Sequence, residues 1–419
     1  MQLGRLDADD QARLGMDTVE NPMVITAVVR VEGALDAGTL LALVEDRILI
    51  HERLRSRIEH TGLLHRTPCW READTDARDQ VTRVVLAPLH ASEGDLTELV
   101  SDLMAQPLDP ERPPWHLWLV DCGNGGSVLV FRIHHAIADG IGLLHLLFGF
   151  SDEGEGTILP QARSTPPSTD RGRIKRAAAL ARLMFRRSDP PCLAGALSGY
   201  KRIAWTAPID LEKLHRAAHA ADAHINDVLL GILAGALRDL IVLDGDVPDV
   251  LHALVPVSLG HDAHALGNHF VSVFVPLPVG LTSATARVHA ARDAMREARA
   301  QSGVPLGRTL VAGASLAGRH AEQAAVRVLS RKASLVATDL AGPPIPLHVA
   351  GHLITEVVFA APAPGSVGLS ASAFSYAGQL RVTIASDAAV IREPTRLTSL
   401  VEAHADATIA ALLASEPTR

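Results

Sequence analysis

Two adjacent histidines, His134 and His135, form the part of this sequence best suited to chemistry. Asp139 and Gly140 follow them at short, fixed offsets, and the apolar run Ser127–Ile133 comes directly before them. The segment therefore lies where a strand should end and a helix should begin. A histidine with an ordinary pKa near 6.5 can accept a proton at neutral pH, as a general base must. The pattern favours a general base at a strand-to-helix junction, with Asp139 and Gly140 holding the loop.

A metal site and a purely structural junction are the two alternatives for this segment. Consecutive strand residues point to opposite faces, so His134 and His135 cannot easily bind one ion. No nearby Cys or His supplies a third ligand at a familiar spacing, and HExxH is absent, so we expect no metal and no resident cofactor. In the structural alternative, Asp139 caps the helix that begins at Gly140 and the histidines are satisfied core groups. Capping by Asp139 is compatible with catalysis by a histidine.

The elements that must position this segment mix strands with helices in both halves of the chain, which favours an α/β or α+β sandwich. Strands are predicted at Met23–Val31, Val81–Leu86, Trp115–Val120, Ser127–Ile133, Leu251–Val257, Phe270–Pro276, Ser334–Leu340, Leu353–Ala360, Gly368–Ser375 and Gln379–Ala385. Helices are predicted at Asp36–Arg55, Gly140–Phe148, Asn226–Leu240, Ala284–Arg299, Ala312–Arg331 and Thr395–Ala414. A short hairpin connection at Tyr376–Gly378 joins the last two strands.

A segment rich in Gly, Pro, Ser and Thr at residues 151–173 predicts a linker. It divides the chain into an N-terminal domain (1–150), a linker with a crossover helix (151–190) and a C-terminal domain (191–419). The crossover helix, Ile174–Arg187, carries several Lys and Arg residues. Its basic face is either simply solvated or rests on an anionic lipid surface.

The composition of the 419 residues excludes several classes of protein. Hydrophobic residues make up 47% and charged residues 21%, which is typical of a globular chain and not of a disordered one. Aromatic residues make up only 3% and the net charge is −8, which argues against a nucleic-acid-binding surface. The three cysteines are far apart, and no secretory signal or uninterrupted apolar span is visible. We therefore expect a cytoplasmic protein, with peripheral contact to membranes or lipid bodies as an option.

The order HHxxxDG after an apolar strand resembles the hallmark of the chloramphenicol acetyltransferase-like superfamily, which includes the condensation domains of nonribosomal peptide synthetases. The rest of the chain is similar to the bacterial wax ester synthase/diacylglycerol acyltransferase family. The matching segments run in order from about Asn21 to Asp387. They are Leu108–Trp115 (LDxxRPLW in the family), Lys201–Ala204, Ile225–Leu230 with Ala234–Arg238 (NDVLL…AGALR), Pro256–Leu259 with Leu266–Asn268 (PVSLR…LGN) and Ser375–Leu380 (SYxGxL).

This resemblance implies two chloramphenicol acetyltransferase-like domains with mixed sheets and an active-site tunnel between them. It also implies an acyltransferase that joins an acyl-CoA co-substrate to a hydroxyl acceptor, a long-chain alcohol or diacylglycerol. The second histidine of the motif, His135, is then the general base, and Asp139 orients the loop through a salt bridge. No GxSxG nucleophile elbow is present, so we expect direct transfer without an acyl-enzyme.

Three further residues are candidates for substrate binding. Asn226 and Asp227 precede an apolar helix, where a helix N-cap is the alternative, and the resemblance brings Asn226 closer to the reaction centre. Asn268 follows a glycine in a loop, where it either hydrogen-bonds a substrate oxygen or shapes a turn. Trp115 and Trp118 lie on a predicted strand and are expected in the core.

The sequence departs from the family at three positions. Asp339 stands where the family's SNVPGP segment has asparagine, Gln80 stands where a histidine is frequent, and Pro114 replaces leucine in PLW. These departures leave His135 untouched and concern the identity of the acceptor. The alternatives to a neutral-lipid synthase are an acyltransferase that modifies a natural product or cell-wall lipid from a carrier-bound acyl group, and a non-catalytic lipid-binding protein.

Overall fold

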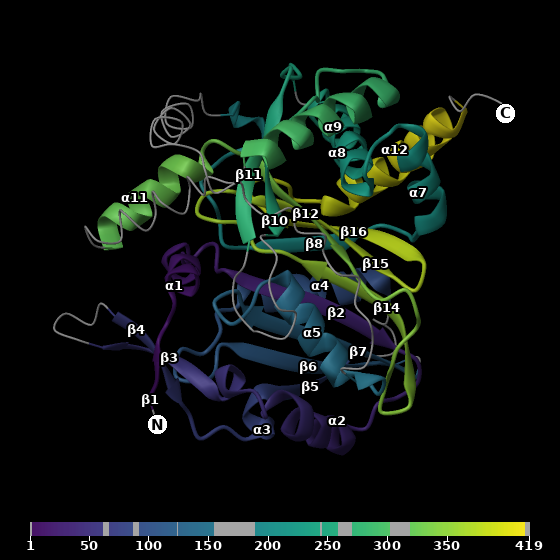
Figure 1. Ribbon diagram of the computed structural model, residues 1–419. Coiled ribbons are helices and arrows are strands. Elements are labelled where there is room, and N and C mark those ends of the chain that lie inside the picture. Colours follow the sequence, from purple (N-terminus) through teal and green to yellow (C-terminus); the bar gives the residue numbers. More distant parts are fainter. Residues whose placement is uncertain are drawn as a thin grey trace.

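The computed structural model of the protein describes residues 2–61, 67–86, 92–123, 125–154, 189–243, 245–258, 270–301 and 319–414. Two large sheets organise this part of the chain, and Figure 1 shows one lying above the other. The predicted helix Ile174–Arg187 and the candidate Asn268 lie outside the described residues. The mixture of strands and helices confirms the α/β class predicted from the sequence.

The first sheet has the strand order β13-β14-β2-β7-β6-β5. Its strands are β2 (Val24–Val31), β5 (Val81–Leu86), β6 (Trp115–Cys122), β7 (Gly126–His134), β13 (His348–Val349) and β14 (His352–Ala360). The pair β5–β6 is parallel and the other pairs are antiparallel, so the sheet is mixed. In the centre, Val24 of β2 pairs with His134 of β7, which places the start of one strand beside the histidine motif.

Alternation along β7 buries both faces of this strand. Leu129 and Ile133 join the core that contains helix α5 (Gly140–Phe150). Val128 and Val130 face the other way, into the core that contains helix α4 (Glu93–Ala105). Successive side chains of a strand point to opposite faces of the sheet, so both sets are buried only where each face is covered. In this sheet, α5 covers one face of β7 and α4 covers the other. Trp115 and Trp118 of β6 are buried in these two cores, as the sequence predicts.

The second sheet has the order β11-β10-β12-β15-β16-β8, with the short β9 (Ile209–Asp210) beside β16. Its longer strands are β8 (Lys201–Trp205), β10 (Leu251–Ser258), β11 (Phe270–Leu277), β12 (Leu335–Ala341), β15 (Leu369–Tyr376) and β16 (Gln379–Asp387). Four helices gather on the upper side of this sheet in Figure 1: α7 (Leu211–Ala220), α8 (Ile225–Ile241), α9 (Ala284–Gln301) and α12 (Pro394–Ala414).

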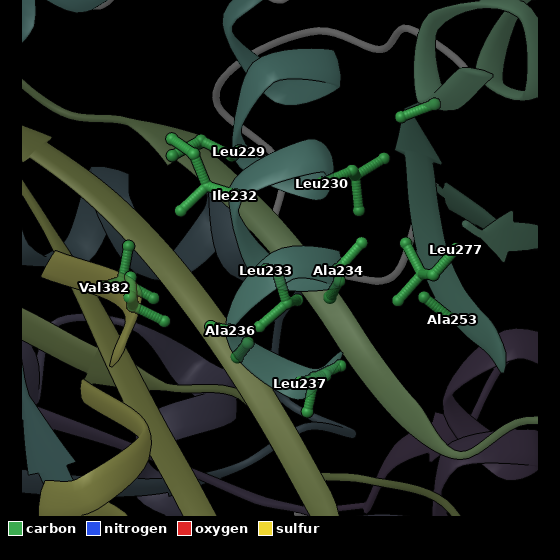
Figure 2. Packing of buried hydrophobic residues seen from close by; sticks show 14 of the residues in the cluster. Leu229, Leu230, Ile232, Leu233, Ala234, Ala236, Leu237, Ala253, Leu277 and Val382 are labelled. Atoms are coloured by element: carbon green, nitrogen blue, oxygen red, sulfur yellow. The ribbon is translucent and has the colours of Figure 1, made fainter. Parts of the chain in front are cut away.

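Helix α8 is buried on nearly all sides. Figure 2 shows Leu230 and Ala234 on the side facing Leu277 of β11, while Val382 of β16 lies on the other side of the helix. Helix α12 has the length and apolar composition of a membrane span, yet its buried residues pack against α8, α7 and β16. That packing is typical of a helix that covers a sheet.

The two sheets are joined by strand exchange. Strand β14, late in the sequence, pairs with β2 in the first sheet, while its neighbours β12 and β15 belong to the second. Division of the chain into two domains at residues 151–190 stays a prediction. A small third sheet of β1 (Gln2–Arg5), β4 (Thr67–Glu72) and β3 (Ser56–Thr61) lies beside the first.

One predicted element is wrong in its extent. The helix predicted at Asp36–Arg55 is divided into α2 (Ala37–Leu43), a π-helical turn (Val44–Ile48) and a 3-10 turn (Glu52–Arg55). Its predicted N-cap is correct, since the Asp36 carboxylate accepts from the Thr39 backbone N–H at 2.8 Å. The final hairpin is as predicted: Ala377 and Gly378, at φ of 47° and 80°, form a two-residue turn of the type that matches strand twist.

Candidate active site

The histidine motif lies in a tight connection between β7 and α5. The His134 N–H donates to the Pro114 carbonyl at 2.8 Å, and the His135 N–H donates to the Met23 carbonyl at 2.7 Å. The Ile137 N–H then returns to the His134 carbonyl at 3.0 Å, which turns the chain away from the sheet. Backbone hydrogen bonds to two neighbouring segments therefore determine where the two imidazoles lie.

Both ring nitrogens of His134 are hydrogen-bonded. Its Nδ1 lies 3.0 Å from the Ala136 N–H, a group that can only donate, so Nδ1 is the acceptor. The ring proton of neutral His134 is therefore on Nε2, which lies 2.9 Å from a carboxylate oxygen of Asp17. A residue with both nitrogens engaged in this way is suited to hold the loop and not to exchange a proton with a substrate.

Asp17 is a member of the site that the sequence did not single out. Its Oδ2 accepts from His134, and its Oδ1 accepts from the Met23 N–H. Met23 in turn accepts from the His135 N–H, so Asp17 links the two histidines through one short segment. It precedes His134 by more than a hundred positions, and a lone aspartate at that separation carries no sequence signal.

The His135 ring, which is 8% exposed, packs against the ring of Phe270 at the start of β11. The ring centroids are 5.6 Å apart with an interplanar angle of 42°. The Arg13 guanidinium of helix α1 (Ala8–Gly15) lies 4.2 Å from the same phenyl centroid, in cation–π geometry. Phe270 belongs to the second sheet and His135 to the first, so His135 lies where the two sheets meet.

The turn after His135 is held by Arg53 and by Asp139. Arg53 donates to the Ile137 carbonyl at 3.0 Å and forms an ion pair with the fully buried Asp10 at 2.9 Å. Asp139 accepts from the Ile141 and Gly142 N–H groups at 3.1 and 3.0 Å, which confirms the capping role predicted for it. The positive end of the α5 helix dipole therefore faces a carboxylate.

Gly140 contributes little steric constraint of its own. A Cβ placed on Gly140 would meet only Leu340 of β12, at an ordinary 3.6 Å. That contact brings the start of α5 beside the second sheet, as the Phe270 contact does for His135.

Gln80 supports the motif from behind, at a position where the family often has histidine. Its buried amide donates to the Pro113 carbonyl at 3.2 Å, and the neighbouring Pro114 carbonyl accepts from the His134 N–H. An amide N–H can replace an imidazole N–H as a donor to a carbonyl. Gln80 therefore supplies a hydrogen bond to the segment that positions His134.

The two candidates on α8 occupy different environments. Asp227 accepts from the His224 N–H at 2.9 Å as the third residue of a capping box, so the N-cap is His224 and neither Asn226 nor Asp227, both of which lie inside the first turn of α8. Burial raises the pKa of Asp227. Asn226 borders an otherwise largely apolar cavity between α8 and the second sheet, here called the α8 cavity, with about 370 Å³ of empty space, part of it open solvent.

Asp339 of β12 also borders the α8 cavity. Burial raises the pKa of its carboxyl, and the neighbouring Asp227 adds to this rise, while Arg299 and His224 oppose it. Asp339 is nevertheless a solvent-exposed residue at the wall of this cavity. The raised pKa moves Asp339 toward its neutral, protonated form, which has the charge of the asparagine usual in the family.

The described residues contain no group of three or more His, Cys, Asp or Glu side chains that could hold a metal ion. The structure brings His134, His135, Asp139 and Gly140 together at one junction. Asn226 and Asp227 lie on a different element, at the first turn of α8.

Comparison with known proteins identifies the family whose sequences this chain matches. Residues 6–207 match the wax ester synthase/diacylglycerol acyltransferase catalytic domain, and residues 266–407 match the WS/DGAT C-terminal domain. A Mycobacterium tuberculosis protein named a probable diacylglycerol O-acyltransferase is 27% identical, with 91% of this chain and 90% of that protein aligned.

Solved structures with a similar fold include two kinds of protein. The wax ester synthase/diacylglycerol acyltransferase from Marinobacter aquaeolei VT8 superimposes with a TM-score of 0.72 at 20% identity, over 97% of this chain and 99% of that one. The first condensation domain of the calcium-dependent antibiotic synthetase superimposes with a TM-score of 0.67 at 19% identity, over 100% and 98% of the two chains. At these identities the likeness concerns the fold.

Proposed function

Because this chain belongs to the wax ester synthase/diacylglycerol acyltransferase family, we propose that it transfers an acyl group from acyl-CoA to a hydroxyl acceptor, diacylglycerol or a long-chain alcohol. The product is then a triacylglycerol or a wax ester. The mycobacterial relative, whose name specifies diacylglycerol, supports the first acceptor.

The difference between the two histidines is the observation that carries the mechanism. His134 uses Nδ1 and Nε2 within the protein, whereas the His135 ring lies against Phe270 at the meeting of the two sheets. His135 is accordingly the general base, and His134 is a positioning residue that acts through Asp17 and the loop.

The reaction proceeds by direct transfer. His135 takes the hydroxyl proton as the alcohol oxygen attacks the thioester carbonyl carbon, which forms the new C–O bond. The tetrahedral intermediate collapses with cleavage of the C–S bond, and the imidazolium returns its proton to the CoA thiolate. Asp139 keeps the loop in place through the first N–H groups of α5.

The test measures CoA thiol release from palmitoyl-CoA by the purified full chain, with dioleoylglycerol, hexadecanol and a water-only blank as acceptors. We expect acceptor-dependent release and an ester product detectable by mass spectrometry. His135→Ala should lower the rate of release by about 10²–10⁴, with an unchanged circular dichroism spectrum as the control for folding. Release at the unsubstituted rate in His135→Ala would refute the base assignment.

Initial rates at varied concentrations of both substrates test direct transfer. Intersecting double-reciprocal lines are expected for a ternary complex. Parallel lines, the pattern of a ping-pong mechanism, would require an acyl-enzyme and overturn this part of the proposal.

A further inference from the structure

A second cavity lies between the two sheets, on the α4 face of the first. It is here called the Arg132 cavity, and it contains about 450 Å³ of empty space, part of it open solvent. Its walls come from β2, β7 and α4 on one side and from β8, β15 and β16 on the other. Polar residues on the walls include Asn21, Arg132, Lys201 and Asp387, all of them buried.

Arg132 is the least satisfied side chain of this cavity. It lies on β7 two positions before His134, and it is 1% exposed. Its Nη2 donates to the Met104 carbonyl at 3.3 Å, but within the described part of the chain its Nε and Nη1 have no hydrogen-bond partner. The Trp118 ring, 5.9 Å from the guanidinium carbon, offers a π face but no acceptor atom. Buried donors of this kind are rare and call for a ligand or solvent.

The charge on Arg132 persists at neutral pH. Burial lowers its pKa to about 10, which still leaves the guanidinium protonated. His116, which pairs with Arg132 on the adjacent strand, brings no negative charge: burial, Arg112 and Arg132 together lower its pKa to about 4, so it is neutral at pH 7. An uncompensated buried cation is strongly unfavourable in a protein interior.

The carboxylate of the cavity, Asp387, already accepts hydrogen bonds at both of its oxygens. Asp387 Oδ1 accepts from the Ser198 N–H and hydroxyl and from the Ala389 N–H, and its Oδ2 accepts from the Gly199 N–H and from Lys201. These donors lower the pKa of Asp387 against the opposing effect of burial, so it stays ionised and balances Lys201.

Both the oxygen and the nitrogen of the Asn21 amide are also hydrogen-bonded within the protein. Its oxygen accepts from Lys201 at 3.0 Å, and its nitrogen donates to three backbone carbonyls between residues 363 and 367. Lys201 uses two of its three ammonium hydrogens on Asn21 and Asp387. The cavity is therefore left with two cations, one carboxylate and a surplus of charged N–H donors.

We propose that the Arg132 cavity binds a small anion, a carboxylate or an inorganic ion, through the unpartnered N–H groups of Arg132 with the help of Lys201. Arg132 comes from the first sheet and Lys201 from the second, so the anion bridges the two. It also lies beside Asn21, in the same short segment as Asp17 and Met23, which position the histidines. The site is thus distinct from the proposed catalytic base and adjacent to the loop that supports it.

The direct experiment uses crystals of the full chain soaked in sodium bromide, because bromide is a small anion with a measurable anomalous signal. The expected result is an anomalous peak within hydrogen-bonding distance of Arg132 Nε or Nη1. Ordered water at this position with no anomalous peak would overturn the proposal.

Thermal unfolding in solution supplies the second measurement. The melting temperature should rise by roughly 1–2 °C for each tenfold increase of a bound anion above its Kd. Sodium formate, sodium chloride and sodium phosphate are compared at equal ionic strength with sodium gluconate, whose anion is larger. A rise with formate alone identifies a carboxylate site, and a rise with chloride or phosphate identifies an inorganic one. Equal melting temperatures in all four salts would contradict the proposal.

Arg132→Met should remove the anion dependence while it fills the same space with an apolar side chain. Arg392→Met, at an exposed arginine with no ion pair in the described part of the chain, is the matched control and should keep it. A dependence that survives in Arg132→Met would locate the anion elsewhere and refute the site. If Arg132→Met fails to fold, the bromide peak in the unsubstituted protein decides the question.

Discussion

His134 and His135 are neighbours of the same residue type, and the structure gives them opposite surroundings. His134, at the end of a strand of the first sheet, is held by hydrogen bonds to Ala136 and Asp17 in the neighbouring loops. The His135 ring packs on Phe270 of the other sheet. His134 is the last residue of β7, whereas His135 begins the turn that follows the strand. The contrast indicates that the two adjacent histidines have different roles: His134 is suited to position the loop, and His135 is suited to react.

Separate substitution of the two histidines should produce the largest difference. His135→Ala is expected to lower kcat/KM by about 10²–10⁴, the range for a lost general base, with little change in melting temperature. His134→Ala should lower kcat/KM less and the melting temperature more, because it leaves Asp17 without its imidazole donor. Steady-state kinetics and calorimetry check both. Equal losses of activity and stability in the two variants would contradict the different roles assigned to the two histidines.

A double-mutant cycle sharpens the role assigned to His134. His134→Ala and Asp17→Ala should each destabilise the protein by about 1–2 kcal/mol, the range for a partly buried hydrogen bond to a charged group. The double variant should lose less than the sum of the two single losses, since both single substitutions remove the same His134–Asp17 interaction. Denaturant unfolding measures the coupling. Simple additivity would show that the 2.9 Å contact contributes nothing.

Substitution of Phe270 addresses the surroundings of His135. Phe270→Ala removes the ring between His135 and Arg13 and should lower kcat several-fold, because the imidazole loses a packing surface. Phe270→Leu, which keeps an apolar contact, should retain more activity. Val85→Ala, at an exposed apolar position on β5, is the control and should be neutral. An unchanged kcat in Phe270→Ala would remove this contact from the site.

The pH dependence of stability distinguishes Asp339 from the asparagine of its relatives. Burial raises the pKa of Asp339, so the folded state holds its proton more tightly than the unfolded state does. The stability associated with this proton is present below the ordinary aspartate pKa and is lost as pH rises through the folded-state pKa. The melting temperature of Asp339→Asn should therefore exceed that of the unsubstituted protein by a margin that grows as pH increases from 4 to 8. A pH-independent difference between the two curves would contradict this.

The regular elements were predictable because local periodicity encodes them. Strand β5 has the predicted bounds, and β7 and α8 differ from their predictions by one residue at each end. Helix Asp36–Arg55 was predicted as a single element because its apolar spacing continues. The structure divides it near Leu49, where Arg47 instead donates to the carbonyls of Phe150 and Ser151 at the end of α5. That contact is long-range and leaves no local pattern.

The motif itself was visible in the sequence, but most of its supporting residues were not. Asp17, Arg53 and Phe270 approach it from three distant segments, and each is a common residue type in an ordinary context. Arg132 gave a partial signal, as a charge that interrupts an apolar strand. Its lack of partners became visible only when β8 and β16 were placed beside it.

The sequence by itself determined the strand-to-helix junction, the capping role of Asp139 and the mixed α/β class, because these depend on neighbouring residues and on short-range hydrogen bonds. The resemblance carried by HHxxxDG and its companion motifs determined the family. The tertiary structure alone decided which nitrogen of His134 carries the proton, what the His135 ring contacts and which buried charges lack a partner. Each of these depends on atoms brought together from segments far apart in the chain, and only the packing of the two sheets determines those distances.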